Sequence, residues 1–270
     1  MSESEEQSLG KEMTFLEHLN ELRIRVTRIL ATIGIIAVIS FSFGIQKFEI
    51  FGITLYLPYP TVFDNISSQI LSKAAHDLLP NYVEIIQIAP GQAIIAQLYV
   101  SVFLGLLFGM PIIIREIWAF VSPALYPHEK KTIAHLTIPA SLLFALGAYF
   151  SYVYVTPLGI DFLYKYGVAV GAKTFVTIED FISFTLLFLV GLGLAFQLPI
   201  IMWFITRLGI VEPRFWWENF RYSFVAMVIF GAVITPDGSG ITMWLVAGPM
   251  IGLYLGTYLL LRFKMKGIQS

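Results

Sequence analysis

Six long apolar runs dominate the sequence, and they limit the folds that the chain can adopt. Five have 17 to 26 residues and one has 14: residues 29–45, 93–114, 133–155, 181–206, 222–235 and 241–261. About 20 helical residues, at about 1.5 Å each, cross the roughly 30 Å hydrocarbon core of a bilayer. Charged residues make up only 13% of the chain, too few to cover the surface of a water-soluble protein of this size. The sequence therefore predicts an integral membrane protein.

The runs predict an all-α polytopic membrane protein with six transmembrane helices. We expect a single membrane domain over residues 1–270, with an N-terminal cytoplasmic helix within residues 1–28. The fifth run of 14 residues spans only about 21 Å as a helix, and the breaker cluster 236–240 follows it. We interpret the fifth and sixth spans as a short hairpin that thins the bilayer locally. A single re-entrant element is the alternative.

The distribution of Lys and Arg predicts the orientation. Thirteen of the 17 lie in the N-terminal segment, the second and fourth connections and the C-terminal tail, whereas four lie in the other connections. Positively charged loops stay in the cytoplasm, so both termini are expected there, in a cell (cytoplasmic) membrane. Residues 1–10 are acidic and polar, which predicts that no cleavable signal peptide is present.

The first external loop, residues 46–92, is long enough to hold structure of its own. Asp64 and Asn65 can cap a helix there, and Pro80 can end it. Its apolar positions fall on one face: Ile66, Ile70, Leu71, Ala74, Leu78 and Leu79. We expect an extracytoplasmic amphipathic helix over the outer mouth of the bundle or along the membrane surface.

The interiors of the six runs contain no Asp, Glu or Lys. This argues against an ion or proton pump, which needs ionisable groups at mid-membrane. Gln197 is the notable polar residue at depth. It can make an interhelical hydrogen bond or form the polar floor of a cavity that receives a partner, and Pro199 beside it favours a kink.

Two carboxylates are expected at the cytoplasmic face. Residues 15–25 read as an amphipathic helix that carries Glu21, and the aromatic, Pro-containing connection 118–131 carries Glu129. Such carboxylates suit a cationic ligand, and arginine better than lysine, because a guanidinium can bind a carboxylate through two hydrogen bonds. The alternative is a solvated interfacial helix held by i,i+4 pairs such as Glu21 with Arg25.

Enzyme classes fit the sequence poorly. The chain has no cysteine, which excludes a Cys nucleophile and thiolate metal sites. His128-Glu129 begins like a zinc-protease motif, but Thr132 stands where the second His is required. Ser239 has no His base at matching depth, and Asp237 has no partner aspartate. We therefore expect no catalytic residue, metal or cofactor.

Four segments together resemble the TatC family, the multispanning receptor subunit of the twin-arginine protein translocase. They occur in order between residues 13 and 262: EHLNELRIR (17–25), WAFVSPALY (118–126) with Glu129, AFQLP (195–199) and TPD (235–237). The first two are highly specific in combination. The resemblance implies proton-gradient-driven export of folded proteins, without ATP use by this subunit.

The resemblance also implies a site and partners. Signal peptides with consecutive arginines would bind at Glu21 and Glu129, with Phe120 beside them and Arg23 shaping the N-terminal helix. TatA-type and, in some systems, TatB-type single-span subunits would pack on the fifth and sixth spans near Thr235, Pro236 and Asp237. A homo-oligomer within the complex is expected, and no nucleic acid.

Two departures from the family pattern affect the prediction. Gln197 stands where the family commonly has Glu, so a hydrogen-bonding role remains and a titrating one is in doubt. The polar Gln that the family often places early in the last span is absent, so partner contacts there do not carry over. Two other functions compete: a small-solute secondary transporter with a pocket around Gln197, and a structural scaffold without a peptide site.

Overall fold

The computed structural model describes residues 15–50, 53–121, 127–235, 237 and 240–266. The described helices are α2 (Phe15–Ser42), α3 (Ile66–Leu78), α4 (Gln92–Val121), α5 (Pro127–Phe150), the π-helix η2 (Ser151–Val155), α6 (Thr156–Ala169), α7 (Ile178–Ala195), α8 (Leu198–Arg207), α9 (Pro213–Glu218), α10 (Phe220–Ile234) and α11 (Ile241–Lys266). The strands are β1 (Phe43–Ile50), β2 (Ile53–Pro60), β3 (Val83–Ile86) and β4 (Thr174–Thr177).

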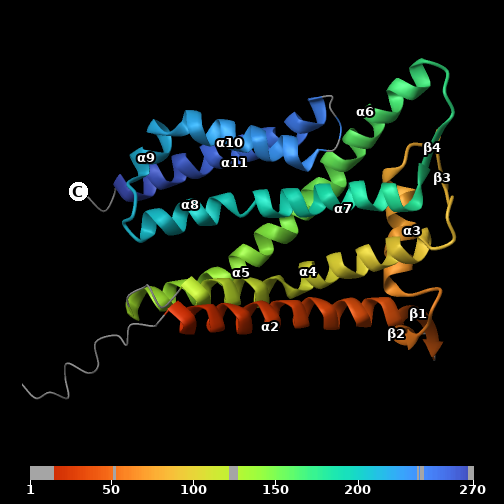
Figure 1. Ribbon diagram of the computed structural model, residues 1–270, viewed down its shortest axis with the longest axis horizontal. Helices are drawn as coiled ribbons and strands as arrows, with labels where there is room; N and C mark the ends of the chain where they lie inside the picture. Colours follow the sequence, from red (N-terminus) through yellow and green to blue (C-terminus); the bar gives the residue numbers. More distant parts are fainter. Residues whose placement is uncertain (1–14, 51–52, 122–126, 236, 238–239, 267–270) are drawn as a thin grey trace, which may run out of the picture.

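The long helices form one elongated bundle (Figure 1). Helices α2 and α4 run side by side, α7 and α8 lie along the middle, and α10 and α11 pair on the far side. We call the end where α2 begins and α11 ends the proximal end, and the opposite end, where α3 lies, the distal end. Within the described residues, five helical stretches are long and apolar enough to cross a membrane: Leu16–Ser42, Gln92–Phe120, Leu136–Ala169, Ile178–Arg207 and Ile241–Phe263.

Two glycines let helix backbones approach closely. A Cβ on Gly105 of α4 would lie 2.5 Å from the carbonyl oxygen of Ile33 in α2. A Cβ on Gly147 of α5 would lie 2.6 Å from the carbonyl oxygen of Leu192 in α7. No side chain larger than hydrogen fits at either crossing. Small residues allow this kind of contact between helices in membranes, where dispersion contacts have to supply much of the attraction.

The third predicted span is longer in the structure than in the sequence analysis. Helical structure continues from α5 through η2 into α6 and ends at Ala169 rather than near residue 155. This path crosses the bundle diagonally (Figure 1). In the π-helical turn, the hydroxyls of Ser151 and Thr156 are buried and lie 3.2 Å apart, so they pair with each other instead of facing lipid.

The fourth span is broken between α7 and α8. Phe196 and Gln197 separate the two helices, and Pro199 occupies the first turn of α8. Because proline has no N–H to donate, it is tolerated in that turn. The kink expected beside Pro199 is therefore a short interruption that places Gln197 between two helices.

The strands correct the all-α prediction: the chain is mostly helical. Strands β1 and β2 pair antiparallel from Phe43 with Pro60 to Ile50 with Ile53, and β3 pairs parallel with β4. The first apolar run was expected to stay helical to residue 45, but α2 ends at Ser42. Backbone groups outside a hydrocarbon core can pair between strands as well as within a helix, and hydropathy alone does not distinguish these cases.

Helix α3 crosses the distal end of the bundle (Figure 1). The Asn65 side chain caps it by accepting a 2.8 Å hydrogen bond from the Ser68 N–H. The same fully buried side chain donates to Gln97 Oε1 on α4 at 2.9 Å, and Ser67 Oγ lies 2.6 Å from Ser101 Oγ. The hydrogen bond between Ser67 and Ser101 and the one from Asn65 to Gln97 therefore fix α3 on α4.

The last two helices differ in length. Helix α10 has 15 residues and α11 has 26, so the expectation of a short sixth span is wrong. At the proximal end, the Tyr254 hydroxyl of α11 donates to the Trp216 carbonyl of α9 at 2.6 Å. Trp216 Nε1 donates to Thr206 Oγ1 of α8 at 2.8 Å. These bonds hold the hairpin of α10 and α11 to the rest of the bundle.

Candidate functional site

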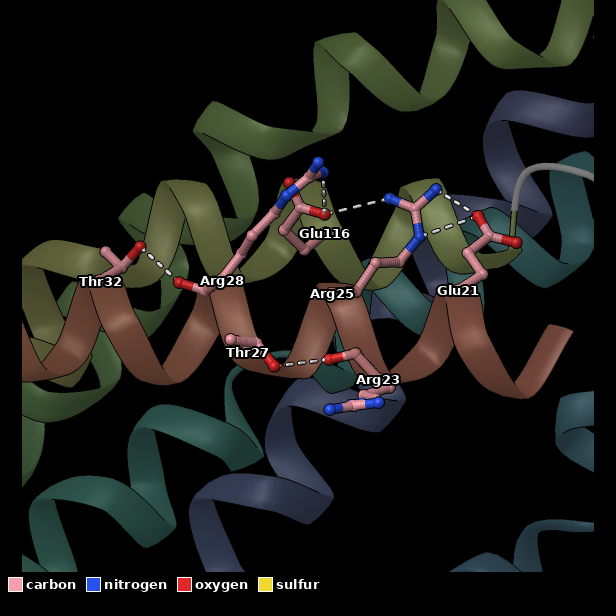
Figure 2. A network of polar contacts seen from close by, with 7 residues as sticks. All are labelled: Glu21, Arg23, Arg25, Thr27, Arg28, Thr32 and Glu116. Carbon is pink, nitrogen blue, oxygen red and sulfur yellow. Dashed lines mark hydrogen bonds and ion pairs between the residues drawn. The ribbon is translucent and has the colours of Figure 1, made fainter. Parts of the chain in front are cut away.

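Four charged side chains form one network between α2 and α4 at the proximal end (Figure 2). The Arg25 guanidinium donates through Nε and Nη2 to Glu21 Oε1, the former bond measuring 2.9 Å. Its Nη1 donates to Glu116 Oε2 at 3.0 Å. Arg28 Nη1 lies 3.6 Å from the same Glu116 oxygen. One guanidinium therefore joins carboxylates from two helices.

Local sequence explains the α2 half of this network. Glu21 and Arg25 are four residues apart, so they lie on one helix face, and Arg28 is three residues further on. Glu116 comes from α4, which packs along α2. The Glu116 side chain is only 6% exposed and those of Glu21 and Arg25 are each 18% exposed, whereas Arg28 reaches solvent. Buried carboxylates of this kind need cations nearby, and the two arginines supply them.

Glu21 keeps one oxygen that is not saturated. Its Oε2 is buried and accepts no hydrogen bond from the residues that the structure describes. His18 Nδ1 lies 3.9 Å from it. The His18 ring stacks on Phe120 of α4, with ring centroids 4.4 Å apart and planes 20° apart. An aromatic pair therefore borders Glu21 beside this buried acceptor atom.

The structure brings some of the predicted site residues together and not others. Glu21 and Phe120 both lie next to His18, which is near the Glu21 carboxylate and stacks on the Phe120 ring. Arg23 is exposed and lies on the opposite side of α2 from Glu116 (Figure 2); its carbonyl accepts a 2.8 Å hydrogen bond from Thr27 Oγ1. Glu129 lies in the first turn of α5, and its side chain is outside the described part of the structure.

Sequence reasoning missed Glu116 and the bridging role of Arg25. Glu116 stands two residues after the second apolar run and was therefore counted with a connection. The signal in the sequence was its position directly after an apolar run. Because α4 continues to Val121, a carboxylate at this position lies on a packed helix. An acidic residue in that place requires a cation from a neighbouring helix.

Gln197 makes hydrogen bonds within the bundle. Its Nε2 donates to the Ala140 carbonyl of α5 at 3.1 Å and to the Gly193 carbonyl of α7 at 3.4 Å. The side chain thus links α5 to the break between α7 and α8. This matches the interhelical hydrogen bond, one of the two roles that the sequence allowed.

The predicted partner-contact residues lie where α10 turns into α11. Thr235 is buried and donates through Oγ1 to the Gly231 carbonyl at 3.0 Å. Thr242 Oγ1 donates to the Asp237 carboxylate. Pro236 lies outside the described residues. Thr235 is therefore bonded to the last turn of α10, and Asp237 to the first turn of α11.

Comparison with known proteins identifies relatives over most of the chain. The family model described as "Sec-independent protein translocase protein (TatC)" matches residues 17–249. "Sec-independent protein translocase protein TatC" of Cenarchaeum symbiosum (strain A) is 45% identical over 243 residues, which cover 90% of this chain and 92% of the relative. The protein of the same name from Aquifex aeolicus (strain VF5) is 32% identical, with the same coverage of both chains.

A solved structure gives the same result. "Crystal Structure of Twin Arginine Translocase Receptor- TatC" superimposes with a TM-score of 0.72 at 29% identity, covering 92% of this chain and 99% of the other. The similarity in sequence and the similarity in fold therefore both extend over nearly the whole length of this chain and of its relatives. The chain belongs to the TatC family and is a core subunit of a twin-arginine protein translocase.

Proposed function

We propose that the chain binds Arg-Arg signal peptides of folded cargo through carboxylates at its proximal end. The observation that carries this proposal is the Arg25 guanidinium between Glu21 and Glu116. The position of this guanidinium supports a site whose geometry suits an arginine side chain. Glu21 Oε2 accepts no hydrogen bond from the described residues and would be a further acceptor. The relative with a solved structure is named a receptor of the twin-arginine translocase. Glu129 would add a second carboxylate for the peptide.

The proposal includes a placement in the membrane. All 270 residues would form one domain with six transmembrane helices in the cell membrane, α10 being the sixth crossing element besides the five long stretches. The proximal end would face the cytoplasm with both termini, because the Lys-rich and Arg-rich connections lie there. Helix α3 would then lie on the outer side. The proton gradient would drive export, with no catalytic chemistry in this subunit.

Partner subunits would pack against the hairpin of α10 and α11. Helix α10 exposes apolar side chains at spacings of three and four residues: Tyr222, Val225, Ile229 and Val233. They form one stripe along the helix, which suits a single-span helix of the TatA or TatB type. Further copies of the chain would join the same complex.

Peptide binding to the purified protein tests this function. A fluorescent signal peptide with Arg-Arg is compared with its Lys-Lys twin on the parent and on Glu21→Gln and Glu129→Gln. We expect the parent to prefer Arg-Arg and each variant to lose about tenfold or more in affinity, because each loses charge-assisted hydrogen bonds. Glu218→Gln is the matched control, since Glu218 is an exposed proximal carboxylate paired with Arg214. Equal binding of both peptides, unchanged in both site variants, would refute the proposal.

A further inference from the structure

We infer that Arg25 is an internal competitor for the signal peptide: it binds both Glu21 and Glu116 in the empty receptor and is held by Glu116 alone when a signal arginine takes Glu21. This inference rests on the proposed function and assigns Arg25 and Glu116 a role in controlling peptide binding. Figure 2 shows the arrangement from which it follows.

The two edges of the Arg25 guanidinium face different carboxylates. Nε and Nη2 face Glu21, and Nη1 faces Glu116. The bond to Glu116 uses a different nitrogen and a different helix, so Arg25 can leave Glu21 and keep a carboxylate partner. A lysine ammonium has its three donors on a single nitrogen, so it lacks the two separate edges with which the guanidinium meets the two carboxylates.

The two carboxylates differ in the cations that lie near them. Glu116 also has Arg28, whose Nη1 lies 3.6 Å away. At Glu21, Arg25 is the only arginine or lysine of the described residues within ion-pair distance, and His18 stands 3.9 Å from Oε2. Glu21 is therefore the carboxylate that can exchange its cation, and Glu116 is the one that retains it.

Binding of a signal arginine at Glu21 is then a competition with Arg25. A signal arginine that takes Glu21 has to replace bonds that Arg25 already makes there. The apparent affinity is then lowered by the fraction of receptors in which Glu21 is free of Arg25. This factor is the same for every cationic peptide, so Arg25 lowers the affinity for Arg-Arg and Lys-Lys peptides alike. The preference for arginine over lysine comes from the carboxylates themselves. Glu116 reduces the competition at Glu21, because it offers Arg25 another partner.

Peptide titrations of three single variants test the inference in the purified full-length chain, with the Arg-Arg peptide as probe. We expect Arg25→Gln and Arg25→Lys to tighten binding by about tenfold, the factor that corresponds to about one charge-assisted hydrogen bond. Glu116→Gln should weaken binding by a similar factor, because Arg25 then depends on Glu21 alone. In either Arg25 background, Glu116→Gln should change affinity by less than about threefold.

Alternative roles give different patterns. If Arg25 merely repels the peptide by its charge, Arg25→Lys binds like the parent, and Glu116→Gln weakens binding equally in every background. If Arg25 only stabilises the fold, its variants bind more weakly and melt at lower temperature by circular dichroism. Either pattern overturns the inference. Should Arg25→Gln not fold, Arg25→Lys carries the test, and Glu218→Gln again controls for loss of a proximal carboxylate.

Failure of the inference is distinguishable from failure of the proposed function. If Glu21→Gln leaves Arg-Arg binding intact, the peptide site itself is wrong. If Glu21→Gln abolishes binding but the Arg25 variants fail to tighten it, the site stands and the competitor is wrong.

Discussion

The strongest stability prediction concerns Asn65, whose buried side chain does two separable things. Its oxygen caps α3 at the Ser68 N–H, and its Nδ2 donates to Gln97 Oε1 on α4. Nδ2 also makes a longer bond of 3.3 Å to the Val62 carbonyl. Asn65→Ser keeps an oxygen that can cap the helix but has no amide donor, whereas Asn65→Ala removes both.

The magnitudes follow from this division. Losing the bond to Gln97 costs about 1 kcal/mol, the usual net contribution of one intramolecular hydrogen bond. Losing an N-cap costs about another 1 kcal/mol. We therefore expect Asn65→Ser to lower the free energy of unfolding by about 1 kcal/mol and Asn65→Ala by about 2 kcal/mol.

Unfolding by SDS titration in mixed micelles, followed by circular dichroism, measures both values. Gln97→Ala, alone and combined with Asn65→Ser, completes a double-mutant cycle that should give a coupling energy of about 1 kcal/mol. Asn65→Ala within about 0.3 kcal/mol of the parent, or strict additivity of Asn65→Ser with Gln97→Ala, would refute the assignment of α3 as a helix tied to α4 through this side chain.

Three further predictions test the packing, the distal hydrogen bonds and the short helix. Gly105→Val should cost about 1–3 kcal/mol in the same SDS titration, because a Cβ there meets the Ile33 carbonyl; a parent-like variant would contradict the close contact of α2 and α4. The Tyr152 hydroxyl, and secondly His76, holds the pKa of Asp77 below its ordinary value of 3.8, so this stabilisation is complete above about pH 5 and is lost as pH falls below about 4. The melting temperature of Tyr152→Phe should accordingly lie below that of the parent by a constant amount above pH 5, with the difference shrinking in acid; a difference independent of pH down to 3 would exclude the bond. Since α10 spans only about 22 Å, the protein should be most stable in phosphatidylcholine bilayers with short acyl chains, and one added apolar turn in α10 should shift that optimum to longer chains; the opposite ranking would refute the mismatch.

Hydropathy predicted which segments form the long apolar helices but not the residues at which these helices begin and end. The five long stretches follow five of the apolar runs, because about 20 apolar residues are a strong signal. Their boundaries depend on backbone pairing, which is less visible in sequence. Thus α2 ends at Ser42, where β1 begins, and α6 continues to Ala169. The short strands β3 and β4 pair across 91 positions, from Val83 to Thr174, and no local pattern indicates such a distant partner.

The candidate site was predictable only in the part that lies within one helix. Glu21 and Arg25 show their relation through the i,i+4 spacing, which predicted that pair as the alternative to a ligand site. Glu116 is 91 residues from Arg25, and its role depends on the contact of α2 with α4. A kink near Gln197 was predicted from Pro199, since both the polar side chain and the proline are local signals; the structure has a full interruption there.

The energetics of the network favour the proposed peptide site over a purely stabilising bridge. Ion pairs that are largely buried gain little net free energy, because the desolvation of both charges offsets their attraction. Exchanging one guanidinium for another at Glu21 desolvates no additional carboxylate, so the free energy of the exchange is close to zero. A site that has to bind a signal peptide and later release it needs such a balance. A carboxylate without a resident cation would instead have to be desolvated and neutralised in the same step. In the receptor proposed above, Arg25 and Glu116 would therefore make binding at Glu21 reversible, while Arg28 would keep Glu116 paired throughout.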